Sequence, residues 1–436
     1  MDVFRARRAR LLASMTAQGG GIAVIPTAPE RERNRGTLFP YRADSHFFYL
    51  CGFREPEAVL VLIAGDSPRQ ILFCRTRNEE QETWTGHRHG PEAATERFGF
   101  DSGESIDELD RKLPELLINQ PALWTSLASE PEWDRRILTA IKTVRAKVRS
   151  GDAAPETVHE ISAVLGEMRL IKDESEIDLI RRAGEISAVA HCRAMRATRP
   201  GRFEYEIEAE LLHAFRAAGS PFPAYQPIVA SGPNACVLHY ADNDRRMADG
   251  ELLLIDAGCE LDGYASDITR TFPVNGRFSG PQRDLYQLVL AASHAARAQV
   301  RPGNGWDAPH EAAITVLTQG FVDLGLLKGK VQELMETEAY RRFYMHRTGH
   351  WLGLDVHDAG RYKTQGQWRP FAPGMALTIE PGCYVRPADD VPEAFWNIGI
   401  RIEDNALVTP EGCEILTEGV PREIEGIEEL MRDRDS

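Results

Sequence analysis

The chain has 436 residues, more than the roughly 250–300 at which a single hydrophobic core stops growing, so two domains are expected. Hydrophobic residues make up 42% and charged residues 27%, as in an ordinary globular protein rather than a disordered or membrane chain. Lys and Arg number 51 against 66 Asp and Glu, and the net charge of −15 argues against nucleic acid as a partner, because phosphate binding needs a basic face.

The cysteines and the apolar segments indicate the compartment. Seven cysteines are scattered along the chain without a C-x-x-C pair, which argues against a disulfide framework and a zinc ribbon. The basic start MDVFRARRARLLASM holds too short an apolar stretch for a signal peptide, and no later run approaches the roughly 20 apolar residues of a membrane span. We therefore expect a cytoplasmic protein without a membrane partner.

Residues 1–170 are predicted to form an α/β domain. The start of the chain has the pattern of a basic amphipathic helix, and short apolar runs bounded by turn residues indicate strands after it. The predicted helices cover residues 4–16, 107–118 and 132–149, and the predicted strands cover 21–26, 57–65, 70–74 and 122–127. Strands mixed with helices in this way are typical of a small α/β unit.

Residues 171–436 are predicted to form a second domain of α+β type with antiparallel hairpins. Asp173 or Ser175 is expected to cap a long helix over 174–198, which stops before Pro200-Gly201. Further helices are predicted at 203–219, 281–300 and 307–325, with strands at 251–258 and 264–274 and strand-like segments up to about 409. The charged tail 426–436 is expected to fray.

A predicted hairpin brings two acids together in the second domain. In ELLLIDAGCELDGYASDITRTF, an apolar strand ends on Asp256, and Asp262-Gly263 marks the turn. With this turn Asp256 opposes Thr269, and Asp267 is its diagonal neighbour on the same face, so both carboxylates can reach one metal. Acids near turns are often merely solvated, but an unpaired carboxylate directly after an apolar run is costly to bury, and a cation compensates for that cost.

Two further acids follow strand-like segments near the C-terminus. Glu380 ends the apolar segment MALTIE and precedes Pro381, which forces an extended backbone. In NIGIRIEDNALV the isoleucines alternate with Arg401 and Glu403, so these two side chains project together on the opposite face. Arg401 is expected to orient Glu403, although a surface Arg and Glu on a half-exposed strand would give the same pattern.

Histidines complete the polar set. MHRTGHWLGLDVHD contains His346, His350 and His357 among glycines, which favours a loop over a helical zinc motif, and His239 lies in VLHYADN. Isolated histidines are mostly satisfied structural groups, but four carboxylates with one imidazole form an oxygen-rich set that suits Mn²⁺ or a similar ion. Four negative charges balance two divalent cations, and two cations sharing a water favour hydrolysis.

The segments IDAGCELDGYASDITRTFPV, MHRTGHWLGLDVHD, LTIEPGCY and GIRIED resemble the pita-bread metallopeptidases, most closely aminopeptidase P. FPYRADSHFFYLCGFREPEAVLVLI and ETWTGHRHGPEAA resemble the N-terminal domain of the same family, so the likeness covers nearly the whole chain. It implies a pita-bread catalytic domain over 171–436 with a curved, largely antiparallel sheet. It also implies that the α/β domain over 1–170 serves oligomerisation and substrate access.

The resemblance also implies the roles of individual residues. Two divalent ions, taken as Mn²⁺, would be held by Asp256, Asp267, His350, Glu380 and Glu403. A hydroxide bridging the ions would attack the bond between an N-terminal residue and a following proline, and Glu380 would pass a proton to the prolyl nitrogen. His239 and His357 are expected to orient the scissile bond and stabilise the oxyanion, with His346 and Arg401 as further catalytic residues.

Proline specificity needs a shaped apolar wall, because the bond before proline has no N–H to recognise. The candidate wall residues are Tyr225, Trp351 and Trp84, and the substrates are peptides with proline at the second position. In the family the tryptophan that matches Trp84 reaches the site of a neighbouring subunit, which implies a homodimer or homotetramer. The alternative is that Trp84 belongs to the local core.

Other functions compete for the same segments. A prolidase has the same metals and fold but cleaves only X-Pro dipeptides, and HWLGLDVHD with Trp351 favours aminopeptidase P over it. A non-catalytic pita-bread module that binds protein partners would have lost metal ligands, whereas all five are present here. A structural Ca²⁺ site fits less well, because His350 is a nitrogen donor.

Overall fold

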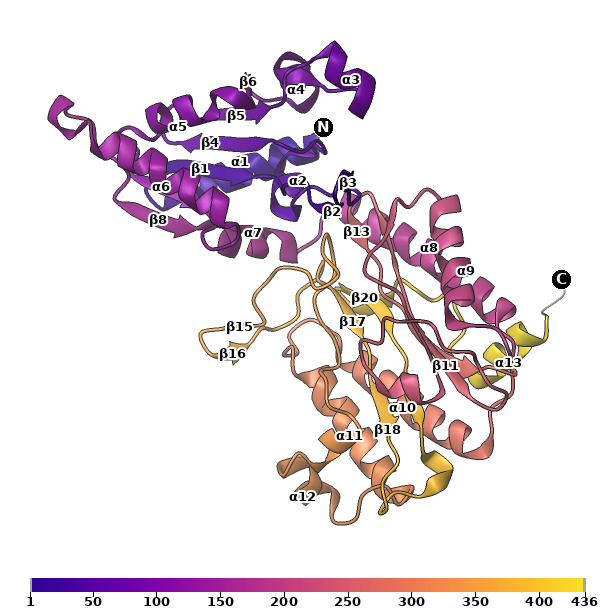
Figure 1. Cartoon of the computed structure of the whole chain (residues 1–436). Coiled ribbons are helices and arrows are strands. Elements are labelled where there is room, and N and C mark those ends of the chain that lie inside the picture. The colour runs from indigo at the N-terminus through magenta and orange to yellow at the C-terminus, as the bar shows by residue number, and fades with distance from the viewer. Residues whose placement is uncertain (1, 434–436) are drawn as a thin grey trace. The chain divides into compact units, whose positions relative to one another are not determined.

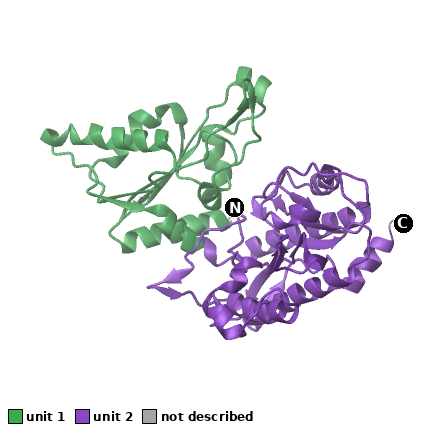
Figure 2. Cartoon of the chain, turned by 60° about the horizontal axis from the view of Figure 1, so that its bottom comes forward, with its two compact units in different colours: residues 1–168 green, residues 169–436 purple. Residues whose placement is uncertain are grey.

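The computed structural model describes residues 2–433 and divides the chain into two compact units, residues 1–168 and 169–436 (Figure 2). The boundary between the units lies two residues before the expected one at 170/171. Among the described residues no helix is both long and apolar enough to cross a membrane.

Unit 1 is built on a six-stranded mixed sheet with helices packed against it (Figure 1). The strand order is β6-β5-β4-β1-β7-β8, with β1, β4 and β5 antiparallel and the β5/β6, β1/β7 and β7/β8 pairs parallel. The sheet strands are β1 Gly21–Pro26, β4 Val59–Ala64, β5 Arg69–Cys74, β6 Ser102–Ser105, β7 Ala122–Thr125 and β8 Thr157–Glu160, and a separate hairpin pairs β2 Glu32–Asn34 with β3 Thr37–Leu38. The helices are α1 Asp2–Ala17, α2 Ser45–Cys51, α3 Glu79–Thr85, α4 Gly90–Phe98, α5 Leu109–Leu117, α6 Pro131–Arg145 and α7 Ile161–Leu170.

Unit 2 combines antiparallel sheets with long helices (Figure 1). The strands are β9 Phe222–Pro223, β10 Ile228–Ser231, β11 Leu252–Asp256, β12 Cys259–Leu261, β13 Tyr264–Ala265, β14 Thr269–Pro273, β15 Lys363–Thr364, β16 Gln367–Trp368, β17 Ala376–Ile379, β18 Gly382–Val385, β19 Ile398–Arg401, β20 Asp404–Thr409 and β21 Gly412–Ile415. The helices are α8 Glu174–Ala197, α9 Glu204–Ala217, α10 Gly280–Gln299, α11 Ala308–Asp323, α12 Val331–Glu336 and α13 Ile424–Arg432. The sheets are β10-β11-β14, β13-β12-β9, β17-β20-β21, β18-β19 and β15-β16.

The hairpin from β11 to β14 has the predicted register. Asp256 pairs with Thr269, and Leu261 pairs with Tyr264 next to the turn. Between these pairs the two arms touch at Gly258, where an added Cβ would lie 1.8 Å from the carbonyl oxygen of Ser266. A bridge between Thr269 and Glu403 then joins this hairpin to the segment between β19 and β20. The acids of both segments therefore meet at one place.

The sequence predicted the cap of α8 correctly, but it did not predict the helix α13 near the C-terminus. Asp173 caps α8, since its side chain accepts the backbone N–H groups of Ser175 and Glu176 while the Glu176 side chain accepts the N–H of Asp173. The expectation that the whole tail frays is wrong for residues up to 432, which form α13. Ile427 and Met431 of α13 are buried, and this apolar stripe anchors the helix. Residues 434–436 of the tail lie outside the described residues.

Candidate active site

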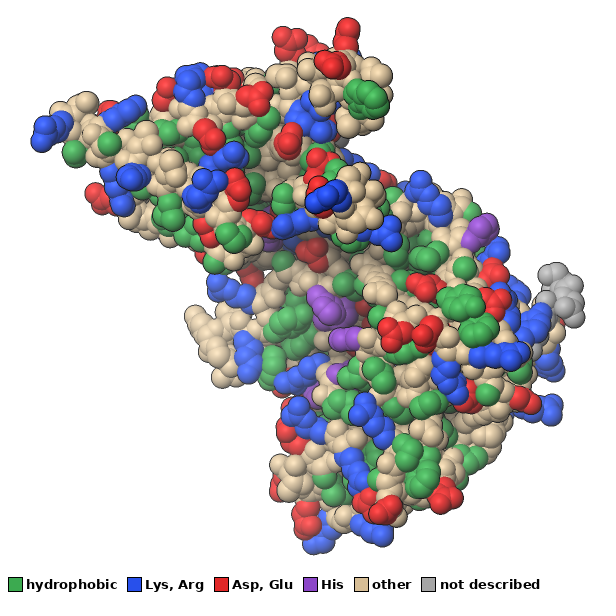
Figure 3. Space-filling view, viewed as in Figure 1, with side chains coloured by type: hydrophobic (Ala, Val, Ile, Leu, Met, Phe, Trp, Pro, Cys, Tyr) green, Lys and Arg blue, Asp and Glu red, His purple; other side chains and the backbone are tan. Residues whose placement is uncertain are grey.

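A cavity of about 760 Å³ in unit 2 gathers the predicted polar residues. Figure 3 shows histidine side chains clustered beside apolar ones on one face of this unit. The predicted residues in the cavity lining are Tyr225, His239, Asp256, Asp267, His346, His350, His357, Glu380, Arg401 and Glu403. Segments far apart in the sequence thus supply one site.

The four carboxylates lie at or just beyond strand ends. Asp256 is the last residue of β11, Asp267 precedes β14, Glu380 directly follows β17, and Glu403 lies between β19 and β20. Their backbones are therefore held by the neighbouring ladders. Asp267 and Glu403 are only 5% and 1% exposed, so their charges are removed from bulk water.

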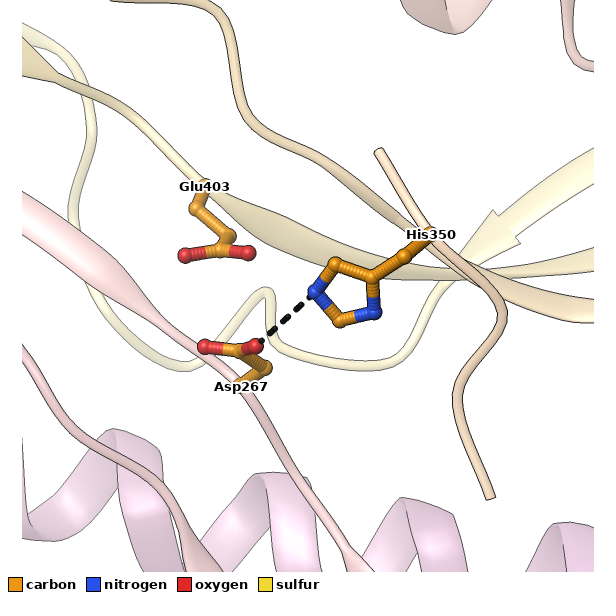
Figure 4. A group of neighbouring side chains, drawn as sticks. All are labelled: Asp267, His350 and Glu403. Atoms are coloured by element: carbon orange, nitrogen blue, oxygen red, sulfur yellow. Dashed lines mark ion pairs between the residues drawn. The ribbon is translucent and has the colours of Figure 1, made fainter. Parts of the chain in front are cut away.

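His350 points at these acids from a loop (Figure 4). Its Nε2 lies 3.4 Å from Asp267 and 3.7 Å from Glu380, and the ligand atoms of Asp267, His350 and Glu403 all lie within 4.8 Å of one another. Its Nδ1 lies 3.0 Å from the carbonyl oxygen of Trp351, which can only accept a hydrogen bond, so Nδ1 carries a proton. Nε2 is the nitrogen left to face a cation.

The four acids outnumber the positive charges beside them, which are Arg401 and, when protonated, His350. Burial and the charges of Asp267, Glu380 and Asp256 raise the pKa of Glu403 well above its usual value. Burial also raises the pKa of Asp256, and it raises that of Glu380 to about 7. Burial lowers the pKa of His350, but the hydrogen bond with Asp267 and the nearby carboxylates raise it to about 9. Carboxylate oxygens with one imidazole, short of positive charge, fit divalent cations.

Arg401 pairs with a different acid from the expected one. Its guanidinium donates to Asp256 at 2.6 Å, to the Thr269 hydroxyl at 3.1 Å and to the Tyr384 hydroxyl at 2.9 Å. The bonds by which Arg401 could orient Glu403, as expected, therefore run through a second side chain. Thr269 donates to Glu403 at 2.7 Å instead, so Arg401 reaches that acid through Thr269. The reason is the Asp256–Thr269 register, which brings β11 and β14 beneath the arginine.

The other three histidines lie in loops of the cavity wall. His239 is exposed, whereas His357 packs edge-on against His350 with ring centroids 4.3 Å apart. His346 lies between Tyr384, whose hydroxyl is 2.8 Å from Nε2, and Glu380, which is 3.8 Å from Nδ1. Burial, helped by Arg401, lowers the pKa of His346 to about 3, so this imidazole is neutral. Its Nδ1 lies 2.7 Å from the carbonyl oxygen of Arg347 and so carries the proton, which leaves Nε2 to accept from the Tyr384 hydroxyl.

A buried ion cluster fixes the residue that follows His357. Asp358 receives a bond of 2.8 Å from Lys172 and a further bond from Arg169, and the Arg169 guanidinium also reaches Asp355 at 2.7 Å. The side chains of Asp358, Lys172 and Arg169 are at most 2% exposed. The loop that carries His357 is therefore tied to the start of unit 2.

The predicted apolar wall needs a correction. Trp351 is 0% exposed and stacks on Tyr362 with the ring planes 4° apart, so it is a core residue and Tyr362 lines the cavity in its place. Tyr225 does line the cavity, but its hydroxyl lies 2.6 Å from Asp256 and is also bonded to Asp267, beside the acids. Trp84 is 80% exposed on α3, so the local-core alternative for it is wrong.

Sequence reasoning missed three residues of the site. Tyr384 lies within the quoted segment LTIEPGCY, four positions after Glu380, and strand alternation could have placed the two on one face. Tyr362 follows the histidine segment by a few residues, and a turn-rich loop gives no periodic signal. Thr269 was predicted opposite Asp256, but its bond to Glu403 joins residues 134 positions apart, and no local sequence pattern indicates such a contact.

Comparison with known proteins gives the class of the molecule. Residues 178–410 match metallopeptidase family M24, and residues 4–124 match the aminopeptidase P N-terminal domain. The M24 match includes all five predicted metal ligands. The fold and the site thus define a metallopeptidase with an added N-terminal domain.

The chain belongs to metallopeptidase family M24, in its aminopeptidase P group. It is 46% identical over 431 residues to the Xaa-Pro aminopeptidase of Haemophilus influenzae, covering 99% of this chain and 97% of that protein. The structure of aminopeptidase PepP from Pseudomonas aeruginosa matches with a TM-score of 0.96 and 48% identity over 98% of both chains. A zinc-substituted Escherichia coli aminopeptidase P in complex with product matches with a TM-score of 0.97 and 43% identity, covering 100% of this chain and 99% of that one.

Proposed function

We propose that the cavity of unit 2 releases the first residue from peptides whose second residue is proline. The observation that carries the proposal is the meeting of four carboxylates and His350 in one cavity of an M24 metallopeptidase. The proposed ligands of two divalent ions are Asp256, Asp267, His350, Glu380 and Glu403. When bound, such ions supply Lewis-acid activation of water and of the scissile carbonyl.

The residues of the chain itself manage protons and orientation. Glu380, a largely buried carboxylate beside the proposed ions, is proposed to take a proton from the attacking water and pass it to the leaving prolyl nitrogen. His239 and His357 donate to the oxyanion, and His346 supports the Tyr384 hydroxyl. Arg401 holds Asp256 in place through a 2.6 Å bond.

Proline recognition rests on the apolar side of the cavity. Ile228, Leu238, Val356 and Tyr362 line it and offer a surface for a pyrrolidine ring that has no N–H to donate. Trp84, which is 80% exposed, completes this wall for a neighbouring subunit. This requires a homodimer or homotetramer, with unit 1 serving oligomerisation and substrate access.

Further features of the proposal concern the ions, the compartment and the sheet. The ions are Mn²⁺, because oxygen donors dominate the set and no cysteine lines the cavity within the described residues. The compartment is the cytoplasm, since all seven cysteines are free thiols and five of them are buried. The antiparallel sheets of unit 2 together form the curved sheet of the pita-bread fold.

The test compares three substrates on the Mn²⁺-loaded enzyme, namely an X-Pro dipeptide, an X-Pro-Y peptide and an X-Ala-Y peptide of matched length. We expect release of the first residue from X-Pro-Y and a loss of activity after chelation that added Mn²⁺ restores. Preference for the dipeptide alone would make the enzyme a prolidase. A chain that binds no metal and cleaves none of the three would be a binding module.

A further inference from the structure

A buried carboxylate outside the metal site holds both ends of the segment that carries His239. Glu204, the first residue of α9, is 0% exposed. Its Oε1 accepts hydrogen bonds from the backbone N–H and the hydroxyl of Ser231, both at 2.7 Å, and from Asn234 at 3.2 Å. These donors lie before His239 in the chain.

The second oxygen of Glu204 holds the other end. Its Oε2 accepts the Tyr240 hydroxyl at 2.8 Å and the backbone N–H of Arg245 at 2.9 Å. Five donors thus satisfy one buried carboxylate, which compensates for the cost of burying its charge. Tyr240 directly follows His239, so its bond to Glu204 restrains the residue next to a side chain of the cavity.

His239 depends on its backbone for its position. Its side chain is exposed at the cavity, where packing gives little restraint, and Leu238 and Ala241 of the same segment also line the cavity. A shift of about 1 Å in a group that acts on the reacting atoms can cost on the order of a hundredfold in rate. The clamp on both sides of the segment is therefore suited to setting where the imidazole lies.

Independent contacts keep the segment folded when Glu204 is altered. Asn243 accepts the N–H of Val229 at 2.9 Å and donates to the carbonyl of Pro227 at 2.9 Å. Arg245 forms an ion pair with Glu251 at 2.6 Å. These contacts fix the far end of the segment without Glu204, so a mild substitution changes position rather than the fold.

We propose that Glu204 is a positioning residue that sets the place of the His239 imidazole in the cavity. The inference rests on the proposed function only for the consequence in rate. In Glu204→Gln one oxygen remains and the other becomes an NH₂, which faces the backbone N–H of Arg245 or that of Ser231, and two N–H groups cannot bond to each other. One end of the clamp is lost while the volume is kept.

The test is a double-mutant cycle of Glu204→Gln with His239→Ala on the metal-loaded enzyme and an X-Pro-Y peptide. We expect Glu204→Gln to lower kcat about tenfold with the metal content unchanged, and to cause no further loss in the His239→Ala background. An equal loss in both backgrounds, or no loss in either, overturns the proposal. Glu210→Gln is the matched control, since Glu210 lies on the same helix but pairs with Arg193 at 2.7 Å.

A second measurement does not depend on hydrolysis. Crystal structures of the wild type and Glu204→Gln are expected to differ in the place or order of the His239 imidazole, and an unchanged imidazole overturns the proposal even if the enzyme proves to have another substrate. If Glu204→Gln fails to fold, Tyr240→Phe carries both tests, because it removes one donor and leaves four. A wild type without peptidase activity would count against the proposed function alone.

Discussion

The four carboxylates proposed to bind metal and the cavity histidines reach the same site by different structural means. Asp256 ends a strand, and Asp267, Glu380 and Glu403 lie one or two residues from strands, so backbone ladders fix them. His239, His346 and His357 lie in loops, where no ladder holds the backbone. A loop has no strand register, so other contacts must hold its side chains in place.

Buried side-chain networks supply that precision. Glu204 clamps the segment of His239, and Asp358 with Lys172 and Arg169 ties down the loop of His357. One cavity thus combines two kinds of order, the strand ladder for the four carboxylates and buried charge for the loops of His239 and His357. The two kinds should respond differently to substitution.

The largest effect is expected where a strand-held ligand is removed. Asp267→Asn should lower kcat/KM by about a thousandfold and reduce the bound metal, because one carboxylate of a shared set is lost. Peptide hydrolysis with elemental analysis of the purified protein checks both results. Asp262→Asn is the matched control, since this exposed turn residue has φ 50°, which Asn tolerates. Full metal content in Asp267→Asn would contradict the ligand assignment.

A smaller effect, on stability, is expected from the ion cluster that holds the His357 loop. Asp358→Asn takes the carboxylate from the buried Lys172 and leaves Arg169 with Asp355, so the free energy of unfolding should fall by about 3 kcal/mol. Urea denaturation of the metal-free protein measures this. Asp355→Asn serves as control, because its side chain is 43% exposed and its contribution should stay below about 1 kcal/mol. Equal losses in the two variants would mean that burial does not set the strength of this cluster.

Removing a loop histidine should change rate but not metal. His357→Ala is expected to lower kcat about a hundredfold while both ions remain bound, since His357 is proposed to stabilise the transition state and not to be a ligand. Steady-state kinetics and metal analysis separate the two effects. His213→Ala, an exposed histidine on α9, should leave both unchanged. Loss of metal in His357→Ala would show that this histidine also holds the ions and does not act on the transition state alone.

The smallest effect concerns a neutral histidine beneath the acid-bearing hairpin. His191 is 0% exposed, its Nε2 donates to the carbonyl of Ala257 at 2.9 Å, and burial lowers its pKa from 6.5 to about 4. As the pH falls below 6.5, His191 is protonated in the unfolded chain before it is protonated in the folded chain, so the folded state loses stability. Between roughly pH 7.5 and 5 the wild type should lose about 2 kcal/mol more than His191→Gln, measured by urea denaturation without metal. Parallel pH curves would show that His191 does not titrate in this range.

Patterns in the sequence correctly predicted the positions of residues that strand pairing holds. The Asp256–Thr269 register followed from the Asp-Gly turn and strand alternation, and Glu380 was placed correctly at a strand end. The burial of Trp351 and the Arg401–Asp256 pair were missed, the latter because it joins residues 145 apart. Contacts of that kind arise from tertiary packing, which periodicity along the chain does not encode.

The contact at Gly258 limits how this site can vary. A single methyl group there would meet the Ser266 carbonyl at 1.8 Å and force apart the arms that set the spacing of Asp256 and Asp267. The spacing of Asp256 and Asp267 is therefore protected by sterics, whereas Leu238 and Tyr362 line the cavity from loops. Engineering a new peptide preference should begin with those wall segments and leave the hairpin untouched.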